Sequence, residues 1–355
     1  MRSSMNKKSV KVLFLGETFR ADAQTWLKGI SAYLDCQIET LEIPAAKSKF
    51  GRLFNSIRFS YELLEKRRTV FDLVLAERST SYGFFSLFTK RKVLVVAQQG
   101  ITDVYPETFL SKLIKGALKR KVYQKADLIH AWGHVMVPAM LKHKAIPSKI
   151  MILPKGIDLE NFTFSTSGKT QNEEHIAIVT RSFKSYYNHK VIIKSIALLK
   201  ERGIKIKFIF VGGGELLESS KELAHKLGVS SYIDFLGVVK NEELPLWLSK
   251  ANIYVSIPQT EGVSASLFEA MASGCFPIVS DLPGTRAFIS NGRNGLLVPP
   301  DSAESLANAL IYYMENTVDF DKALVDNRTF IEKNVSQHKN FKIISQKYIS
   351  LVNSK

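Results

Sequence analysis

The sequence predicts an α/β protein with two doubly wound domains, and two observations predict it. Short apolar, β-branched runs alternate with helical stretches through the first half of the chain, and the alternation restarts after residue 174. The 355 residues also match the length of two ordinary domains. Because strands that are apolar throughout belong to parallel sheets covered on both faces, we expect one such sheet in each half.

The first half contains five expected strands, each a short and mostly apolar run. They are Lys11–Leu15, Phe71–Ala76, Lys92–Ala97, Asp127–Ala131 and Lys149–Leu153. A helix with an apolar stripe through Trp26, Leu27, Ile30 and Tyr33 is expected after the first strand. This order of strands and helices predicts parallel pairing.

The second half repeats the pattern. Its expected strands are Ile176–Thr180, Lys207–Val211, Tyr232–Leu236 and Ala251–Ile257, and helices are expected near 190–202 and over Leu267–Ala272. The glycines at 212–214 lack the spacing of a dinucleotide-binding fingerprint, so we interpret them as a turn. Residues 159–174 are polar and aperiodic, and we place the linker there.

Composition excludes several classes of protein. Apolar residues make up 45% and charged residues 23%, which is typical of a soluble globular protein. Two cysteines, Cys36 and Cys275, provide neither a disulfide framework nor zinc-ligand spacing, and the histidines show no ligand spacing, so no metal is expected. The apolar stretch after the basic N-terminus is too short for a signal peptide, and no run approaches the ~20 apolar residues of a membrane span. We therefore expect a cytoplasmic protein.

Positive charge is concentrated in the N-terminal half. Residues 1–165 contain 27 Lys and Arg against 14 Asp and Glu, whereas the remainder contains 22 against 19. Much of the excess lies in two amphipathic stretches, 47–68 and 109–125. In the second, apolar residues at helical spacing (Leu110, Leu113, Ile114, Ala117, Leu118) are opposed or flanked by basic ones (Lys112, Lys115, Lys119, Arg120, Lys121). Such a helix suits an anionic membrane surface; the alternative is a helix packed on the core with a solvated lysine face.

Two glutamates separated by seven residues, Glu261 and Glu269, mark the candidate functional site. An expected strand precedes them, and the expected helix after the first glutamate ends at Gly274. The small residues between them place backbone N–H groups at the helix N-terminus, which favours anions. A sugar nucleotide needs such a combination, with N–H donors for its diphosphate and carboxylates for the hydroxyls of ribose and hexose.

This segment resembles the E-x7-E signature of retaining glycosyltransferases of family 4, and the segments Phe276–Gly284 and Asn291–Pro299 are similar to that family as well. The resemblance implies the GT-B fold, in which two Rossmann-like domains face each other across a cleft. It implies an acceptor-binding domain at 1–160, a donor-binding domain at 161–336, and a last helix at 337–355 that packs back on the first domain. An apolar stripe fits that helix: Phe341, Ile344, Tyr348 and Leu351.

The resemblance also implies the reaction and its residues. The donor is a nucleotide-diphosphate sugar, with UDP or GDP as the nucleotide, and neither a metal nor another cofactor takes part. Glu269 is expected to bind the ribose, Glu261 the hexose near the reacting centre, and the amides of Gly262, Val263 and Ser264 the diphosphate. Arg181 is expected to stabilise charge on the leaving nucleotide. Attack from the front face needs no protein nucleophile, so Glu261 and Arg181 are the catalytic candidates.

Other positions match the family less well. The family has a lysine six residues after the arginine, where this chain has Tyr187, and either Lys184 or Lys190 could supply the ammonium. Gln99 stands in the place of a histidine in a His-Gly-x-x-Asp pattern that ends at Asp103; an amide can orient a sugar or acceptor but cannot transfer a proton.

Three further positions carry weaker expectations. Gly16 ends the first strand near the expected donor phosphate, although an ordinary turn explains it equally well. Val239 is expected near the nucleotide base. Lys155 stands at the asparagine position of a hinge motif, where we expect a structural role.

The predicted protein is a retaining, metal-independent hexosyltransferase in the synthesis of cell-surface polysaccharide, such as lipopolysaccharide, or of glycolipid. Its acceptor is expected to be a saccharide or lipid-linked, at the inner face of the membrane. One alternative is a non-catalytic nucleotide-sugar-binding protein, motivated by Tyr187 and Gln99. Another is a nucleic-acid-binding protein, motivated by the pI of about 9.6, although no nucleic-acid-binding signature is present and no nucleic-acid partner is expected.

Overall fold

The computed structural model describes residues 9–44, 48–98, 109–164 and 175–355. The chain divides into two compact units, Met1–Lys155 with Gln337–Lys355 (unit 1) and Gly156–Ser336 (unit 2). The expected boundary after residue 160 lies slightly beyond the observed one, because Ile157 N–H donates to the Val335 carbonyl (2.8 Å) and the Ile157 side chain is buried in the core of unit 2. Part of the expected linker, residues 165–174, lies outside the described residues.

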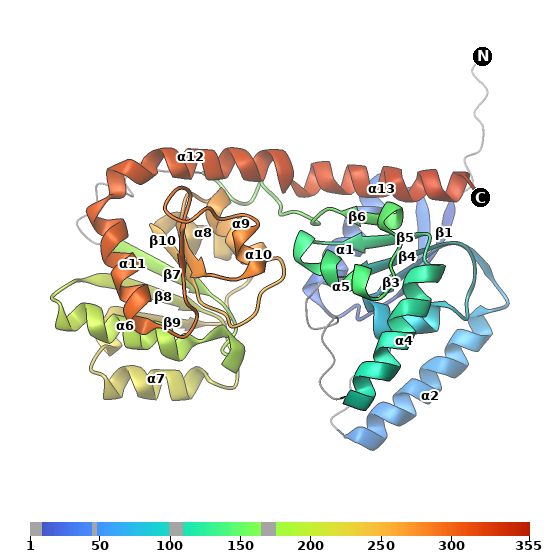
Figure 1. Cartoon of the computed structure of the whole chain (residues 1–355), viewed down its shortest axis with the longest axis horizontal. Coiled ribbons are helices and arrows are strands. Elements are labelled where there is room, and N and C mark those ends of the chain that lie inside the picture. Colours follow the sequence, from blue (N-terminus) through green and yellow to red (C-terminus); the bar gives the residue numbers. More distant parts are fainter. Residues whose placement is uncertain (1–8, 45–47, 99–108, 165–174) are drawn as a thin grey trace, which may run out of the picture. The chain divides into compact units, whose positions relative to one another are not determined.

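Unit 1 is built on a six-stranded parallel sheet in the order β2-β1-β3-β4-β5-β6 (Figure 1). The strands are β1 Val10–Leu15, β2 Cys36–Leu41, β3 Val70–Glu77, β4 Lys90–Gln98, β5 Leu128–Ala131 and β6 Ile150–Ile152. The helices are α1 Ala21–Tyr33, α2 Lys49–Lys66, α3 Gly83–Ser86, α4 Phe109–Lys125, α5 Val137–Lys142 and α13 Gln337–Asn353, with short helical turns η1 Arg78–Tyr82, η2 His134–Met136 and η3 Pro147–Lys149. Strand order reverses direction after β2, so right-handed crossovers place α1 on one face and α2, α3 and α4 on the other.

The last helix, α13, packs against α1 and covers that face of the unit 1 sheet (Figure 1). Its apolar stripe is buried through Phe341, Ile344 and Tyr348. A Cβ at Gly29 would lie 2.4 Å from the Phe341 ring, so α1 needs glycine at the crossing point. The Tyr348 hydroxyl lies 2.9 Å from Nδ1 of buried His130 on β5, which ties α13 to the sheet.

Unit 2 has a second six-stranded parallel sheet, in the order β12-β11-β10-β7-β8-β9. The strands are β7 His175–Thr180, β8 Ile206–Val211, β9 Ile233–Gly237, β10 Ile253–Ser256, β11 Phe276–Ser280 and β12 Leu296–Val298. The helices are α6 His189–Glu201, α7 Leu217–Lys226, α8 Leu244–Lys250, α9 Ala265–Ala272, α10 Pro283–Arg286, α11 Ala303–Glu315 and α12 Thr317–Asn334, with turns η4 Ser185–Tyr187 and η5 Ser230–Tyr232. One apolar core lies under α6 and α11 and another under α8, α9 and α12, so both sheet faces are covered.

The predicted fold class is confirmed, because both sheets are parallel and doubly wound. All nine expected strands are present, with ends that differ by one or two residues. Three strands, β2, β11 and β12, were not expected, because the sequence signal of each is weak. Along most of the edge strand β2, residues alternate between partly buried and exposed. β12 is only three residues long, and β11 contains Pro277, a residue that argues against a strand.

The charge asymmetry is larger between the structural units than between the sequence halves. Unit 1 contains 31 Lys and Arg against 12 Asp and Glu, whereas unit 2 contains 18 against 21. In the described ranges, no helix combines the length and apolarity needed to cross a bilayer.

The expected orientation of α4 is wrong in one respect. Lys119, expected on the solvated side, is buried, because α4 packs against η1 and α3 through the face that also carries Val122 and Tyr123. Leu113 and Ile114, which belong to the expected apolar stripe, are exposed instead. The side chain of Lys112 lies outside the described residues.

Candidate functional site

Arg181 joins three segments of unit 2 that are far apart in sequence. It follows β7, and its Nε donates a hydrogen bond to Ser256 Oγ at the end of β10 (3.0 Å). Its terminal nitrogen donates to the Glu261 carboxylate and to Ser264 Oγ. Parallel strands β7 and β10 are neighbours, so their carboxyl ends meet at the sheet edge where doubly wound folds bind ligands.

The charge of Arg181 is secured by its surroundings. The Arg181 and Glu261 side chains are both largely buried. Burial by itself lowers the pKa of Arg181, but the nearby oxygens of Tyr254, Glu261 and Tyr187 outweigh this and raise it. The guanidinium therefore stays cationic at any physiological pH, and its Nε and one terminal nitrogen donate hydrogen bonds to protein oxygens.

Tyr187 covers the guanidinium at the position where the family has a lysine. The Arg181 guanidinium carbon lies 5.1 Å from the centre of the Tyr187 ring. Burial raises the pKa of the phenol, and Arg181 acts in the opposite direction. Lys184 and Lys190, the two expected substitutes for the lysine, are exposed and make no ion pair with the described residues.

The Arg181 segment is held by close backbone packing. A Cβ at Gly212 would lie 2.3 Å from the Arg181 carbonyl oxygen, and one at Gly214 would lie 2.6 Å from that of Phe183. Both glycines also have positive φ, at 143° and 150°. The glycine turn after β8 is therefore the support on which the arginine loop rests.

The loop between the two glutamates leads directly into α9. Ser264 is the N-cap residue of α9, and its Oγ accepts a hydrogen bond from Leu267 N–H (3.2 Å) as well as from Arg181. Gly284 packs under the loop, since a Cβ there would lie 2.3 Å from the Glu261 carbonyl oxygen. Glu261, Gly262, Val263 and Ser264 thus lie beside a guanidinium and a helix N-terminus, an arrangement suited to an anion.

Glu269 lies one turn into α9, as the sequence predicts. Burial raises the pKa of its carboxyl to about 7, against the opposing influence of Arg181. No described residue donates a hydrogen bond to this carboxylate. A half-buried carboxylate without a protein donor is a natural acceptor for ligand hydroxyls.

The remaining expected site residues do not all lie in unit 2 with Arg181 and the two glutamates. Val239 follows β9 in unit 2 and packs partly against the core. Gly16 ends β1 in unit 1, where a Cβ would lie 2.6 Å from the Phe14 ring and 2.7 Å from Glu77 Cγ, so packing alone requires glycine there. Gln99 and Asp103 lie outside the described residues.

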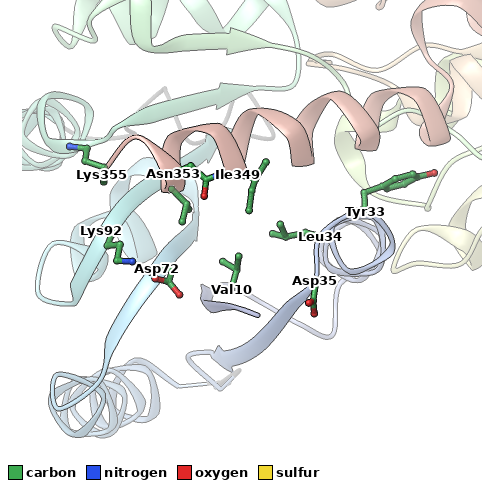
Figure 2. Close-up of a pocket in the computed structure, with 10 residues that line it drawn as sticks. Val10, Tyr33, Leu34, Asp35, Asp72, Lys92, Ile349, Asn353 and Lys355 are labelled. Atoms are coloured by element: carbon green, nitrogen blue, oxygen red, sulfur yellow. Dashed lines mark ion pairs between the residues drawn. The ribbon is translucent and has the colours of Figure 1, made fainter. Parts of the chain in front are cut away.

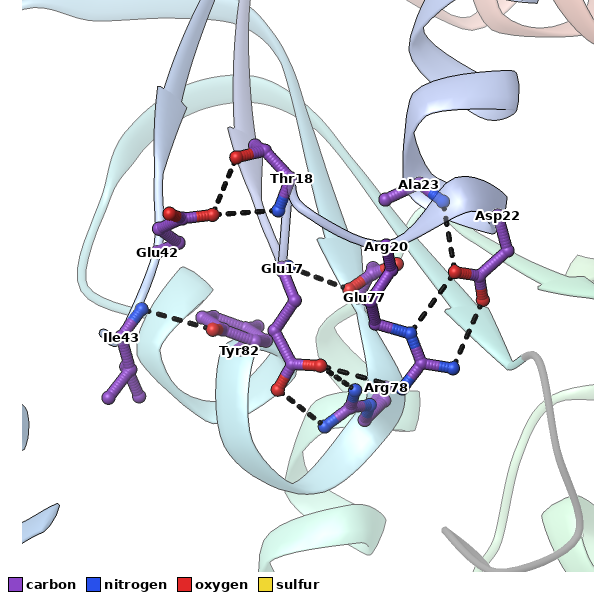
Figure 3. A network of polar contacts seen from close by, with 10 residues as sticks. All are labelled: Glu17, Thr18, Arg20, Asp22, Ala23, Glu42, Ile43, Glu77, Arg78 and Tyr82. Atoms are coloured by element: carbon purple, nitrogen blue, oxygen red, sulfur yellow. Dashed lines mark hydrogen bonds and ion pairs between the residues drawn. The ribbon is translucent and has the colours of Figure 1, made fainter. Parts of the chain in front are cut away.

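Unit 1 has a charged network at the carboxyl ends of β1 and β3 that was not predicted (Figure 3). The Arg78 guanidinium donates to both Glu17 carboxylate oxygens (3.1 and 2.5 Å). The backbone N–H of Glu17 donates to buried Glu77 (2.9 Å). The signal in the sequence was the charged residues directly after the two strands, at the edge where parallel sheets carry their sites.

Lys155, for which the sequence predicts a structural role, is buried in unit 1. Its buried ammonium donates to the Asp22 carbonyl oxygen (2.5 Å) and lies 4.0 Å from the centre of the Trp132 ring. Burial lowers its pKa to about 8, although Asp22 and Glu77 oppose the change. These contacts fit the structural role expected of this position.

The pocket in Figure 2 lies at the amino ends of the unit 1 strands, opposite the carboxyl ends that carry the charged network. It has a volume of about 680 Å³ and is lined by the start of β1 at Val10, by Asp72 and Lys92 near the starts of β3 and β4, and by the end of α13. Asp72 and Lys92 pair with each other (2.8 Å). Because ligands of doubly wound folds bind at the carboxyl ends of strands, this pocket is not the candidate site. Within the described part of the chain, no group of three or more His, Cys, Asp or Glu side chains is placed to hold a metal ion.

The segment that carries the candidate site matches a known protein family. Residues 161–329, which contain both glutamates and Arg181, match the family model for glycosyl transferases group 1. This segment, which makes up most of unit 2, is similar to that family, and the whole chain has the GT-B fold.

Several proteins are similar to this chain. An uncharacterized glycosyltransferase of Methanocaldococcus jannaschii is 26% identical over 317 residues, covering 86% of this chain and 79% of that protein. A phosphatidyl-myo-inositol mannosyltransferase of Mycolicibacterium smegmatis is 25% identical, covering 65% of this chain and 55% of that protein. Among solved structures, Anabaena HepE in complex with UDP superimposes with a TM-score of 0.76 at 15% identity, covering 96% and 100% of the two chains. At that identity the likeness concerns the fold.

Proposed function

We propose that this protein is a retaining, metal-independent hexosyltransferase that uses a nucleotide-diphosphate sugar and acts on a saccharide or lipid-linked acceptor. The observation that carries the proposal is the cluster of Arg181, Glu261 and Ser264 at the N-terminus of α9, with Glu269 one turn away. It combines cationic and N–H donors for a diphosphate with two carboxylates for sugar hydroxyls.

Binding of the donor would change the hydrogen-bond partners of Arg181. The terminal nitrogen of Arg181 donates hydrogen bonds to Glu261 and Ser264. A diphosphate bound at the α9 N-terminus would take over these guanidinium donors. Glu261 would then be released to accept hydrogen bonds from the hexose hydroxyls, while Glu269 accepts those of the ribose.

The transfer step would depend on stabilisation of the leaving group. The bond between the anomeric carbon and the diphosphate oxygen breaks, and the acceptor oxygen bonds to that carbon from the same face. The acceptor proton passes to the departing phosphate, so no protein base or metal is required. Arg181 and the α9 N-terminus would stabilise the negative charge that develops on the diphosphate.

The acceptor would bind unit 1. Its excess of 31 basic over 12 acidic residues favours an acceptor that carries negative charge, such as a phosphate-linked lipid or an acidic saccharide. Two similar proteins support this direction by their names, the phosphatidyl-myo-inositol mannosyltransferase and a colanic acid biosynthesis glycosyltransferase of Salmonella typhimurium. Synthesis of cell-surface polysaccharide or glycolipid, at the inner face of the membrane, would combine these features.

Ligand-dependent thermal unfolding tests the donor site. Wild type and Glu269→Ala would be heated with UDP-, GDP-, ADP- and dTDP-sugars, because a ligand at 100 times its dissociation constant adds about 2.7 kcal/mol of stability. We expect one nucleotide class to raise the midpoint of the wild type and to lose most of that effect in the variant. The absence of any shift would contradict the proposal.

A non-catalytic nucleotide-sugar-binding protein is the second candidate, motivated by Tyr187 in the lysine position. Both candidates predict donor binding, so turnover separates them. Release of free nucleotide from the stabilising sugar nucleotide, including slow hydrolysis without acceptor, identifies the enzyme. Binding without any release identifies the non-catalytic protein.

A further inference from the structure

Helix α2 carries a continuous row of large apolar side chains that face solvent. They are Phe50, Phe54, Ile57, Tyr61 and Leu64, each between 54% and 86% exposed. Their spacing of four and three residues places them on one side of the helix over a length of about 21 Å. An exposed apolar surface of this extent marks an interaction site rather than an ordinary scatter of surface residues.

The row is not the face that attaches α2 to its unit. The opposite side of the helix is buried through Phe59 and Leu63. Phe59 packs edge-on against Phe85 (ring centroids 4.9 Å apart) and Tyr82 (5.8 Å). The helix is therefore anchored without the row, which remains available for a partner.

The charges around the row indicate what that partner is. Arg67 and Arg68 follow the end of α2 and are exposed. Arg58 is also exposed beside the row but pairs with Glu62 (2.8 Å), and Glu65 is exposed on the same helix, so the unpaired cations among the described side chains lie at the end of α2. Unit 1 as a whole has the strongly basic balance given above. Apolar and aromatic side chains combined with flanking cations are the composition of helices that lie in the interface of anionic membranes.

We propose that α2 docks unit 1 on an anionic lipid surface, with Phe50, Phe54, Ile57, Tyr61 and Leu64 inserted at the boundary between headgroups and acyl chains. Arg67 and Arg68 contact the lipid phosphates. This surface differs from the lysine face expected on α4, and it adds burial of apolar area to electrostatic attraction.

Helix α4 offers a smaller surface of the same character. Leu113 and Ile114 are more than half exposed. A groove of about 450 Å³ beside them is lined by Arg120, Lys121, Lys142 and Lys144, and no described residue lining it is acidic. Because α2 and α4 both cover the face of the sheet opposite α13, α4 can add headgroup contacts to those of α2.

This inference goes beyond the proposed function, because it depends on α2 and not on the identity of the acceptor. A lipid-linked acceptor would be reached from such a surface, but membrane docking and sugar transfer are measured separately. The experiment below therefore reports on docking even if the proposed reaction is wrong.

Co-sedimentation with vesicles tests the docking surface. The full chain, the double variant Phe54→Asp/Ile57→Asp and the double variant Arg67→Glu/Arg68→Glu would be mixed with vesicles of phosphatidylglycerol and phosphatidylcholine, and with phosphatidylcholine alone. Val325→Asp is the matched control, since Val325 is also a half-exposed apolar residue on a long helix, α12. Thermal unfolding checks that each variant is folded.

We expect the wild type and the control to bind anionic vesicles and the apolar-row variant to bind at least tenfold more weakly. Each cation removed should lower partitioning about fivefold, and reversal should lower it further. Equal binding of wild type and the apolar-row variant, or equal binding to neutral and anionic vesicles, would overturn the proposal. So would a wild-type dimer in sedimentation velocity that the row variant abolishes without any binding to vesicles, because the spacing of the row also suits a helical seam between two copies.

Discussion

The guanidinium of Arg181 lies against the face of the Tyr187 ring, with 5.1 Å between the guanidinium carbon and the ring centre. In the resembling family the position of Tyr187 carries a lysine. Here a neutral aromatic ring stabilises one cation instead of a second cation standing beside it. The diphosphate site of this chain would therefore depend on Arg181 and the α9 N-terminus more than a two-cation site does.

Tyr187→Lys, which places a lysine at the family position, should lower the stability of the fold and raise the affinity for a nucleoside diphosphate. Tyr187→Lys removes the cation–π contact and places like charges together, so we expect the free energy of unfolding without ligand to fall by about 1 kcal/mol. The new ammonium should tighten nucleoside diphosphate binding about tenfold through a charge-assisted hydrogen bond. Chemical denaturation and calorimetric titration measure the two effects. Tyr187→Phe, which keeps the ring and loses only the hydroxyl, is the control and should change both much less.

Loss of the Arg181 guanidinium should affect both catalysis and folding. Arg181→Ala leaves Glu261 largely buried without its ion-pair partner, which should cost about 3 kcal/mol of folding stability. It should also lower kcat by about 10²–10³ by removing charge stabilisation from the leaving group. Arg181→Lys should recover little, because an ammonium cannot reproduce the fork that contacts Ser256, Glu261 and Ser264. Arg293→Ala, at an exposed arginine of the same unit, should leave both properties unchanged.

Glu269 should make stability and donor binding depend on pH. Burial raises the pKa of its carboxyl from 4.5 to about 7. Between these values the folded chain holds a proton that the unfolded chain releases, so this contribution to stability is full below about pH 4.5 and is lost as pH rises through about 7. The loss should reach about 3 kcal/mol and should be absent in Glu269→Gln. Denaturation of both proteins across this range is the measurement, and parallel curves would contradict it.

The same ionisation should act on ligand binding with the opposite sign. Only the carboxylate accepts hydrogen bonds from both ribose hydroxyls, so nucleotide affinity of the wild type should rise as pH increases through about 7. Glu269→Gln should bind more weakly at high pH and show a flat profile. Calorimetric titration of the stabilising nucleotide at several pH values tests this expectation.

Gly284 should be required for the position of the Glu261 loop. A methyl group there would meet two backbone oxygens, 2.3 Å from Glu261 O and 2.6 Å from Gly262 O, and backbone cannot yield as a side-chain end can. Gly284→Ala should lower the free energy of unfolding by about 1–3 kcal/mol and weaken donor binding. In the control, Gly116→Ala on α4, the added carbon meets an ordinary contact of 3.4 Å and should be neutral or stabilising by up to about 1 kcal/mol. Equal effects at the two glycines would contradict the prediction that Gly284 is required for the position of the Glu261 loop.

The parts of the fold that were predictable are those whose signal is local. Strands such as β3 and β4 are buried on both faces and are therefore continuous apolar runs in sequence. The edge strand β2 alternates between partly buried and exposed residues, and β11 includes Pro277, so neither has that signal. The glutamate pair was predictable for the same local reason, because a strand, a small-residue loop and a helix follow one another directly.

The orientation of surface helices was not predictable from periodicity. On α4 the face with Lys119 packs inward while Leu113 and Ile114 face solvent, and on α2 both sides of the helix are apolar. Helical periodicity shows that one side of a helix is more apolar than the other. Which side of α4 is buried depends on its contacts with η1 and α3. The network of Glu17, Arg78 and Glu77 was also not predictable from the sequence, since its members come from the ends of separate strands.

The sequence by itself determined the fold class, the order of the elements and the two glutamates, because strand burial, helix caps and motif spacing act over a few neighbouring residues. Only the tertiary structure decided that Arg181 pairs with Glu261 and lies under Tyr187, that Glu269 is buried enough to raise its pKa, and that the apolar row of α2 faces solvent. These properties depend on which strand ends become neighbours and on which surfaces are covered. Both are set by the packing of segments remote in sequence, which no local pattern encodes.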